Sequence, residues 1–261
     1  MNSVRPKKKL GQHFLTDLNL AKKIADLLDD TPHKNIVEIG PGTGVLTQFI
    51  ISKADALHLI EIDKESIEFL QKQYRPTAFN LIEGDFLKLD LTQVVGAKPF
   101  TVIGNFPYNI SSQIIFKVLD YHGQIPFLVG MFQKEVAERI CELPGSKKYG
   151  ILSVLTQLYY DTTYLFTVPP QVFNPPPKVE SAVLRLEQKK NYTLACNEKL
   201  LTQIVKLSFQ QRRKTLRNSL KSLNLPDNLR EDSIFDLRPE NLSVDDFIQL
   251  TKRIDHGNIS N

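Results

Sequence analysis

The stretch Asn35–Thr47, NIVEIGPGTGVLT, combines a short apolar run, a glycine-rich turn and the start of a helical pattern. Apolar runs of this length, bounded by polar residues and glycine, are typical of strands buried in a parallel sheet. Glycine lets the backbone adopt a positive φ and come close to a ligand. The order strand, glycine turn, helix therefore predicts the first βα unit of a ligand-binding α/β fold.

The same alternation continues along the chain to residue 141. Strands are expected at 56–63, 79–85, 99–105 and 126–132, and helices at 44–53, 64–74, 111–119 and 134–141. This βαβα rhythm predicts a mainly parallel sheet with helices on both faces, a Rossmann-like α/β fold. Ligands of such sheets bind at the carboxyl ends of the strands.

Two further strands and a group of helices are expected in the rest of the chain. A helix at 150–160 precedes strands at 162–169 and 181–188, and helical patterns follow at 198–223, 229–237 and 243–254. Composition shifts near Lys189. We therefore expect a ligand-binding catalytic domain over residues 1–188, with a basic N-terminal arm at 1–15, and a small all-helical C-terminal domain over 189–261.

Composition places the chain among ordinary globular proteins. Of its 261 residues, 41% are apolar and 24% are charged, which suffices for a sizeable core. No apolar run is long enough to span a bilayer, and the basic N-terminus lacks the apolar stretch of a secretory signal. Cys141, Cys196 and the five scattered histidines form no metal motif. We expect a monomeric cytoplasmic protein that contacts no membrane and binds no metal.

Positive charge is concentrated at Arg5–Lys9 and at Gln210–Lys221, although the net charge is only +4. Such runs are either solvated surface charge or parts of a phosphate-binding surface. Within the expected helix 198–223, Arg213, Arg217 and Lys221 are spaced to share one face. Composition alone leaves both interpretations open.

The glycine turn does not match the dinucleotide-binding fingerprint. That fingerprint is G-x-G-x-x-G/A, whereas Gly40, Gly42 and Gly44 follow a G-x-G-x-G spacing and Val45 occupies the third small position. A nicotinamide-dependent dehydrogenase is therefore disfavoured. A glycine turn alone is weak evidence for any ligand, because tight turns also use glycine for structural reasons.

Acidic residues follow the next two expected strands. Glu61 lies about twenty residues after the glycines, where an acid binds ribose hydroxyls. It could instead cap the next helix, although Asp63 is the better capping candidate. Asp85 could accept a hydrogen bond from an adenine amino group, or serve as a turn residue. Because a glycine turn and polar residues end four successive strands, we favour a shared nucleoside pocket.

The fourth strand ends in GNFPYNIS, Gly104–Ser111, which places an amide, two aromatic rings and a proline together. The Asn105 side-chain carbonyl and the Phe106 backbone carbonyl can accept hydrogen bonds from an exocyclic adenine amine and localise its lone pair. Pro107 fixes φ in the turn, and Tyr108 offers a ring for base stacking. The alternative is a strand-ending turn whose rings are buried in the core.

Together these features match the pattern of S-adenosylmethionine-dependent methyltransferases, which bind a nucleoside but no pyrophosphate. The chain resembles the KsgA-type ribosomal RNA adenine N6,N6-dimethyltransferases in particular. The resemblance rests on KKKLGQHFL, GPGTGVLT, EID, EGDFL, GNFPYNIS, VPPQVFNPPPKVESAVLRL and SFQQRRKTLRNSL, which run from Lys7 to about Leu223. The sequence departs from the family at Phe106, where leucine is frequent, and at His13, where asparagine is common.

The resemblance implies a class I methyltransferase fold, S-adenosyl-L-methionine as cofactor and S-adenosyl-L-homocysteine as product. It implies that Gln12, His13 and Leu15 border the cofactor, together with Gly40, Gly42, Glu61, Asp85 and Asn105. It makes Asn105, Phe106, Pro107 and Tyr108 the catalytic motif, and Phe173 the second ring that sandwiches the flipped adenine with Tyr108. Arg213, Lys214, Arg217 and Lys221 would contact rRNA.

The implied substrate is a pair of adjacent adenines in the 3′-terminal hairpin of 16S rRNA, each dimethylated within a late small-subunit precursor. One alternative is an Erm-type 23S rRNA adenine methyltransferase, which shares the catalytic motif. Another is a non-catalytic RNA-binding or assembly factor on the same scaffold. The intact Asn105, Pro107 and Tyr108 beside an intact glycine turn favour an enzyme.

Overall fold

A computed structural model describes residues 4–190 and 192–259 of the chain. Residues 1–3 of the expected arm, and residues 191, 260 and 261 of the expected helical domain, lie outside the described residues. The chain divides into two compact units: the first extends to Ala137 and resumes over Asp161–Gln188, and the second comprises Glu138–Tyr160 and the chain from Lys189. The expected boundary between residues 188 and 189 stays a prediction.

The first unit is built on a seven-stranded sheet of order β4-β3-β2-β5-β6-β9-β7. The strands are β2 (Asn35–Ile39), β3 (Ala56–Glu61), β4 (Asn80–Glu83), β5 (Thr101–Asn105), β6 (Phe127–Gln133), β7 (Tyr160–Val168) and β9 (Ser181–Gln188). The five strands from β4 to β6 pair in parallel, and β9 is antiparallel to β6. The predicted mainly parallel α/β sheet is confirmed.

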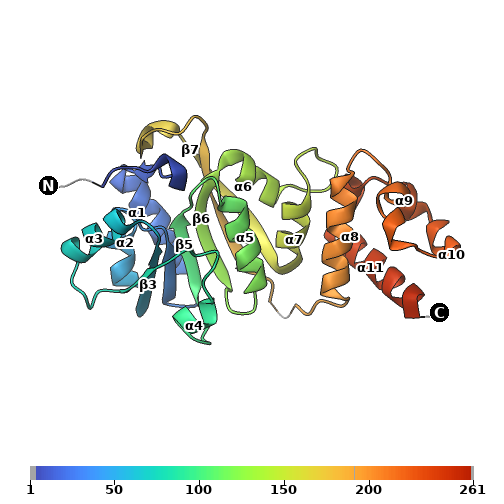
Figure 1. The fold of residues 1–261 in the computed structure, drawn as a ribbon, viewed down its shortest axis with the longest axis horizontal. Coiled ribbons are helices and arrows are strands. Elements are labelled where there is room, and N and C mark those ends of the chain that lie inside the picture. The colour runs from blue at the N-terminus through green and yellow to red at the C-terminus, as the bar shows by residue number, and fades with distance from the viewer. Residues whose placement is uncertain (1–3, 191, 260–261) are drawn as a thin grey trace. The chain divides into compact units, whose positions relative to one another are not determined.

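Helices cover both faces of this sheet (Figure 1). On one side lie α1 (Leu18–Asp26), α2 (Thr47–Ile50) and α3 (Lys64–Gln73), and on the other lie α4 (Leu91–Val95), α5 (Ser111–Asp120) and α6 (Lys134–Cys141). Aspartates cap α1, α3 and α4 with their side chains, as capping propensity predicts. None of the helices in the described part of the chain combines the length and apolarity that crossing a bilayer requires.

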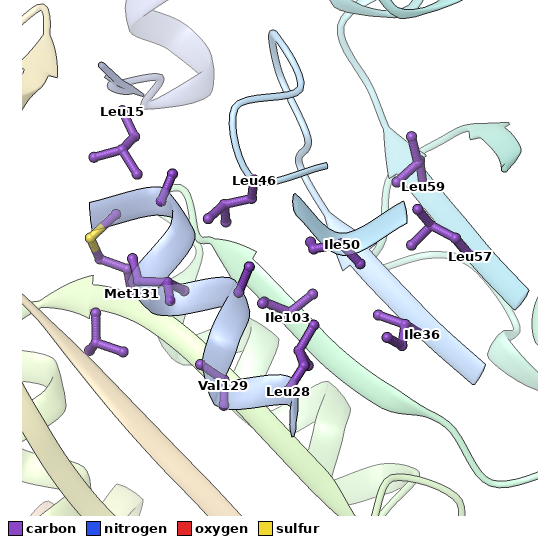
Figure 2. Close-up of a cluster of buried hydrophobic side chains, with 14 of the residues drawn as sticks. Leu15, Leu28, Ile36, Leu46, Ile50, Leu57, Leu59, Ile103, Val129 and Met131 are labelled. Carbon is purple, nitrogen blue, oxygen red and sulfur yellow. The ribbon is translucent and has the colours of Figure 1, made fainter. Parts of the chain in front are cut away.

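The hydrophobic core on the α1 side joins the helices to the sheet. Leu28 lies in the 3-10 turn η2 (Leu27–Asp30), which follows α1, and its side chain lies beside Ile103 and Val129 of the central strands (Figure 2). Met131 lies further along the same face. Burying a side chain of this size contributes about 1.5–3 kcal/mol. Because side chains alternate along a strand, the neighbours of these residues face the opposite helices. The sheet is thus held on both sides, and its carboxyl edge is fixed.

The N-terminal segment is part of the first unit. It forms a 3-10 turn, η1 (Lys8–Leu10), and a short strand, β1 (Phe14–Leu15), before α1 begins. Strand β1 pairs antiparallel with β8 (Phe173–Asn174), which follows the turn η4 (Pro170–Val172). Two segments about 160 residues apart in sequence are thereby joined.

The second unit is helical from Lys189 onward, as predicted, but one expected helix is wrong. Its helices are α7 (Ile151–Tyr159), α8 (Glu198–Gln210), α9 (Leu216–Ser219), α10 (Asp227–Arg230) and α11 (Val244–Ile259), with 3-10 turns η5 (Lys221–Leu223), η6 (Ser233–Asp236) and η7 (Pro239–Asn241). The single helix expected over 198–223 ends at Gln210. A turn precedes α9, because Thr215 adopts an extended conformation.

The helix expected over 44–53 is also shorter than predicted. Only Thr47–Ile50 is α-helical, and Ile51–Lys53 forms the 3-10 turn η3. The start of α2 is tied to β2, because the Thr47 hydroxyl donates a 2.7 Å hydrogen bond to the Glu38 carboxyl. Glu38 is only 1% exposed. Its burial raises the pKa of this carboxyl to about 8, with a smaller contribution from the nearby Glu61 charge and opposed by the Thr47 hydrogen bond.

Replacing Glu38 by glutamine is expected to change how stability depends on pH. Because the pKa of Glu38 is higher in the folded protein than in the unfolded chain, the protonated carboxyl stabilises the folded state. This stabilisation is complete below the unfolded pKa, near 4.5, and is lost as pH rises through about 8. The free energy of unfolding of the parent protein should therefore fall relative to Glu38→Gln by about 1.4 kcal/mol per pH unit between about pH 5 and 8. Urea unfolding at a series of pH values measures this difference.

The matched control is Glu68→Gln, which changes an exposed carboxyl on α3. Its unfolding free energies should run parallel to those of the parent protein. Parallel curves for Glu38→Gln as well would contradict the neutral, buried state assigned to Glu38.

Candidate active site

A cavity of about 250 Å³ lies at the carboxyl edge of the sheet in the first unit. Its walls come from the N-terminal arm and from the ends of four strands. They include Leu10, Gly11, Gln12, His13, Phe14, Gly40, Gly42, Glu61, Asp85, Asn105, Phe106, Pro107 and Tyr108. The structure thus brings the glycine turn, the two acids and residues 105–108 to one cavity, as the strand-end pattern predicts.

Glu61 holds the glycine turn in place. One carboxylate oxygen accepts a 3.0 Å hydrogen bond from the Gly42 N–H, and the other accepts 2.8 Å bonds from the Ile62 and Asp63 N–H groups. Burial raises the pKa of the Glu61 carboxyl, although the three N–H donors act in the opposite direction. The acid at the end of β3 therefore shapes the turn as well as lining the cavity.

Two glycines of the turn have a positive φ, which residues with side chains rarely adopt. Gly40 has a φ of +66°, and a Cβ there would find its nearest neighbour, Pro107 Cδ, at 4.0 Å. Gly42 has a φ of +56°, and a Cβ there would lie 2.8 Å from the Phe14 ring. Glycine keeps the cavity open at the first position and lets the arm approach at the second.

Asp85 follows β4 and reaches the same cavity. One carboxylate oxygen accepts a 3.0 Å hydrogen bond from the Leu87 N–H, which makes the local turn. The other oxygen lies 3.7 Å from the Lys88 ammonium, whose side chain is highly exposed. Asp85 is thus both a turn residue and a cavity residue, so its two interpretations are compatible.

The N-terminal arm is anchored to the end of β3. Lys7 forms an ion pair with Asp63, and the Gln12 amide donates a 3.2 Å hydrogen bond to the same carboxylate. Asp63 also caps α3, the role for which it was the preferred candidate. Burial by itself would raise the pKa of Asp63, but hydrogen bonds from Lys7, Gln12 and Ser66 outweigh this and lower it. An ionised Asp63 thereby fixes the arm beside the cavity.

Asn105 is oriented by the arm. Its Nδ2 donates a 2.9 Å hydrogen bond to the backbone carbonyl of His13. Because a carbonyl can only accept, the amide nitrogen must face His13. The Asn105 Oδ1 is therefore the acceptor that the amide presents on its other side.

Tyr108 is held at both ends of its side chain. Its hydroxyl is hydrogen-bonded to the Ser181 side chain at the start of β9. Its ring stacks on the His13 imidazole, with centroids 5.2 Å apart and planes at 27°. Burial raises the pKa of the Tyr108 hydroxyl, opposed in part by the Ser181 contact. The phenol is therefore neutral and fixed in orientation.

The Phe106 ring, unlike its backbone, belongs to the core. It is 1% exposed and packs edge-on against Phe132, with centroids 4.9 Å apart. A Cβ at Gly130 would lie 2.1 Å from this ring, and one at Gly104 would lie 2.7 Å from it. These two glycines are register partners on β5 and β6. Together they leave the space that the Phe106 ring occupies.

Two of the expected site residues do not line the cavity. Leu15 and Phe173 are each 3% exposed, lie in the hydrophobic core and are register partners in the β1–β8 pair. Neither Phe173 nor Leu15 is among the residues that line the cavity, so their expected contacts with the target base and the cofactor stay predictions. In this structure both residues fix the course of the arm.

The expected rRNA-binding residues lie in the second unit and do not share one helical face. Arg213 and Lys214 are exposed in the turn after α8, and Lys221 is exposed on η5. Arg217 instead donates to Asp236 at 2.8 and 3.1 Å and to the Arg230 carbonyl. The predicted single face is wrong because the helix is interrupted, and Arg217 holds helical segments together.

Within residues 4–190 and 192–259, no group of three or more His, Cys, Asp or Glu side chains is arranged to hold a metal ion. The cavity does suit a nucleoside-bearing cofactor. It offers an open position at Gly40, a partly free carboxylate oxygen at Asp85 and a carboxylate at Glu61.

Comparison with known proteins identifies the family. Residues 3–256 match the family model described as ribosomal RNA adenine dimethylase. The chain belongs to this family. It is 58% identical to the ribosomal RNA small subunit methyltransferase A of Flavobacterium johnsoniae, covering 98% of both chains. It is 55% identical to the protein of that name from Phocaeicola vulgatus, covering 98% of this chain and 91% of the relative.

Solved structures agree with this assignment. A dimethyladenosine transferase from Plasmodium falciparum superposes with a TM-score of 0.82 at 28% identity, over 94% of this chain and 98% of the other. The 23S rRNA methyltransferase ErmE superposes with a TM-score of 0.66 at 23% identity, over 93% and 99%, and shares the fold. The expected class I methyltransferase fold is confirmed.

Family membership makes the chain an rRNA adenine N6,N6-dimethyltransferase and implies S-adenosylmethionine as its methyl donor. The resemblance to KsgA-type enzymes is therefore confirmed. The chain is therefore assigned as an enzyme and not as a non-catalytic assembly factor on the same scaffold.

Several residues that shape the site were missed at the sequence level. Ser181 and Lys7 lie far from their partners Tyr108 and Asp63 in sequence, and no local pattern pairs them. Gly130 did leave a signal, because a glycine inside a buried strand often marks a close approach. The Phe106 ring occupies the space that a side chain at Gly130 would fill.

Substituting Gly130 by alanine is expected to impair both stability and methylation. The added methyl group collides with the Phe106 ring, and overpacking of this kind costs about 1–3 kcal/mol. It also displaces the Phe106 backbone carbonyl at the cavity. Adding Phe106→Leu should restore most of the lost free energy of unfolding and of the lost rate, because leucine vacates the space.

The test is a double-mutant cycle. Thermal unfolding and the methylation rate are measured for the two single variants and for the double variant. Strictly additive effects of Gly130→Ala and Phe106→Leu would show that the two positions are not coupled.

Proposed function

We propose that the chain transfers methyl groups to N6 of two adjacent adenines in the 3′-terminal hairpin of 16S rRNA, dimethylating each. The substrate would be a late precursor of the small ribosomal subunit in the cytoplasm, and the enzyme would act as a monomer. Support comes from two relatives, 58% and 55% identical to this chain, which are both named ribosomal RNA small subunit methyltransferase A. The Erm-type structure shares the fold at lower identity.

The strand-end cavity is the proposed cofactor site. Glu61 would accept hydrogen bonds from the ribose hydroxyls, and Asp85 would accept one from the adenine amino group. Gln12, His13 and Gly40 would border the remainder, because all three line the cavity. When bound, S-adenosylmethionine supplies an electrophilic sulfonium methyl group.

The Asn105 amide is the observation that carries the proposed reaction. Because Nδ2 donates a hydrogen bond to the His13 carbonyl, Oδ1 is the acceptor that remains for a target amine. The Phe106 carbonyl would supply a second acceptor, since the Phe106 N–H is fixed by a 3.1 Å hydrogen bond to the Met131 carbonyl. Two fixed acceptors would draw the amine hydrogens out of the plane of the base. The nitrogen lone pair is then localised on N6 and directed toward the methyl group. Pro107 restricts the turn that presents them.

Tyr108 would stack on the target adenine once it is flipped out of the helix. Stacking of this kind contributes about 1–3 kcal/mol per base, comparable to the cost of unstacking. The transfer is an in-line displacement that depends mainly on orientation at short distance. A neutral Tyr108 fits this role, because the methylated ammonium is acidic enough to lose its proton to water.

Removing the Asn105 side chain is expected to slow methylation strongly without abolishing particle binding. Asn105→Ala deletes the Oδ1 acceptor, and loss of one preorganised group of this kind costs about 10²–10³ in rate. Binding to undermethylated small subunits is measured by co-sedimentation, and the rate by transfer of a labelled methyl group. Asn80→Ala, an exposed amide on β4, is the matched control. An Asn105→Ala enzyme with parental rates would contradict the assignment.

Substrate choice is tested by offering purified large and small ribosomal precursors with labelled cofactor. We expect label in the small-subunit rRNA, at two adjacent adenines located by mass mapping. Label confined to the large-subunit rRNA would favour an Erm-type enzyme instead.

The basic residues of the second unit should differ in their effects. Alanine at Arg213, Lys214 or Lys221 is expected to weaken particle binding and to reduce its salt dependence by about one unit of slope each, because each would contact a phosphate. Arg217→Ala should also lower the melting temperature, because it breaks the contacts with Asp236 and Arg230. Binding titrations at several salt concentrations and thermal unfolding separate the two classes. Salt slopes equal to that of the parent protein, or an Arg217→Ala variant that melts at the parental temperature, would contradict this division.

A further inference from the structure

His13 is joined to three parts of the active site at once. Its backbone carbonyl accepts the hydrogen bond from Asn105 Nδ2. Its imidazole Nδ1 lies 2.7 Å from the Pro175 carbonyl, so this nitrogen carries the proton and donates. Its ring stacks on Tyr108. The backbone of His13 thus serves the catalytic amide, and its side chain covers the catalytic ring.

The imidazole covers one face of the Tyr108 ring, where a base could otherwise stack. Stacked aromatic pairs have ring centroids about 4.5–7 Å apart, and the His13–Tyr108 distance of 5.2 Å falls in this range. A flipped adenine cannot lie against the same face of Tyr108 while the imidazole remains there. Phe173, the other ring expected at the target site, is buried in the core.

We propose that the His13 imidazole is a placeholder for the target adenine, covering Tyr108 in the free enzyme and being displaced when the flipped base enters. The inference rests on the proposed stacking role of Tyr108. Only the side chain of His13 has to move, because the backbone carbonyl that orients Asn105 stays where it is. Displacement breaks one stacking contact and one hydrogen bond to the Pro175 carbonyl.

This arrangement makes the imidazole a competitor of the substrate. If only a fraction of the enzyme has an uncovered Tyr108, the apparent affinity for the target falls by that fraction. A base that stacks weakly, or that is not held by the rest of the particle, fails to displace His13. The residue is therefore a specificity-determining position, and a side chain without a ring at position 13 would not cover Tyr108.

The test compares variants with and without a ring at position 13. Undermethylated small subunits are methylated at saturating S-adenosylmethionine, and KM for the subunits and kcat are determined for His13→Ala, His13→Asn and His13→Phe. Both ringless variants should show a KM about five- to tenfold lower than the parent, since a stacking contact and a hydrogen bond no longer compete. His13→Phe, which keeps a ring on Tyr108, should show no such fall.

Affinity for S-adenosylhomocysteine is measured separately by calorimetry, so that a change in cofactor binding is not attributed to the target base. A higher KM for both ringless variants would overturn the proposal, because it would make His13 a stacking partner of the base. Recovery of parental KM by asparagine but not by alanine would also overturn it, because it would indicate a hydrogen-bonding role. An unchanged KM in all three variants contradicts it as well.

A second experiment separates this inference from the function on which it rests. In a Tyr108→Leu background, His13→Ala should leave KM unaltered relative to Tyr108→Leu alone, because there is no longer a ring to cover. If Tyr108→Leu itself methylates with parental constants, the stacking role of Tyr108 is wrong. If Tyr108→Leu is impaired but His13→Ala still lowers KM in that background, only the placeholder role of His13 fails.

Discussion

The hydrogen bond from Asn105 Nδ2 to the His13 carbonyl is the contact on which the active site depends. It joins the end of β5 to the N-terminal arm, two segments about ninety residues apart in sequence. It also fixes the orientation of the Asn105 amide. A carboxamide in solution would have no such fixed orientation. The direction in which the Asn105 Oδ1 acceptor points is thus a consequence of where the arm lies.

The arm is held in that position from both ends. At one end, Lys7 and Gln12 bind the ionised Asp63, which in turn caps α3. At the other end, β1 pairs with β8, and both contribute side chains to the core under the sheet. The sheet supplies the third fixed element, because the carboxyl ends of its parallel strands meet at one edge. The residues proposed to bind the cofactor and the target base therefore line one cavity.

Much of this could be predicted from the sequence, for identifiable physical reasons. The parallel sheet follows from apolar runs alternating with helical patterns, and the cavity follows from Glu61, Asp85 and Asn105 ending successive strands. Asp63 was recognisable as a helix cap from its position. By contrast, the helix expected over 198–223 was too long, because apolar and basic spacing does not reveal where Gln211 and Thr215 leave helical geometry. Contacts between distant segments, such as Tyr108 with Ser181 and Phe106 with Gly130, leave little trace in local pattern.

The central claim is that the Asn105 carbonyl oxygen receives the target amine, and a crystal structure tests it most directly. The enzyme would be crystallised with S-adenosylhomocysteine and a short RNA carrying the target adenines. We predict Asn105 Nδ2 still bonded to the His13 carbonyl and Oδ1 within about 2.7–3.2 Å of the adenine N6. An adenine N6 that contacts other groups, with Asn105 Oδ1 well beyond hydrogen-bond distance, would contradict the account.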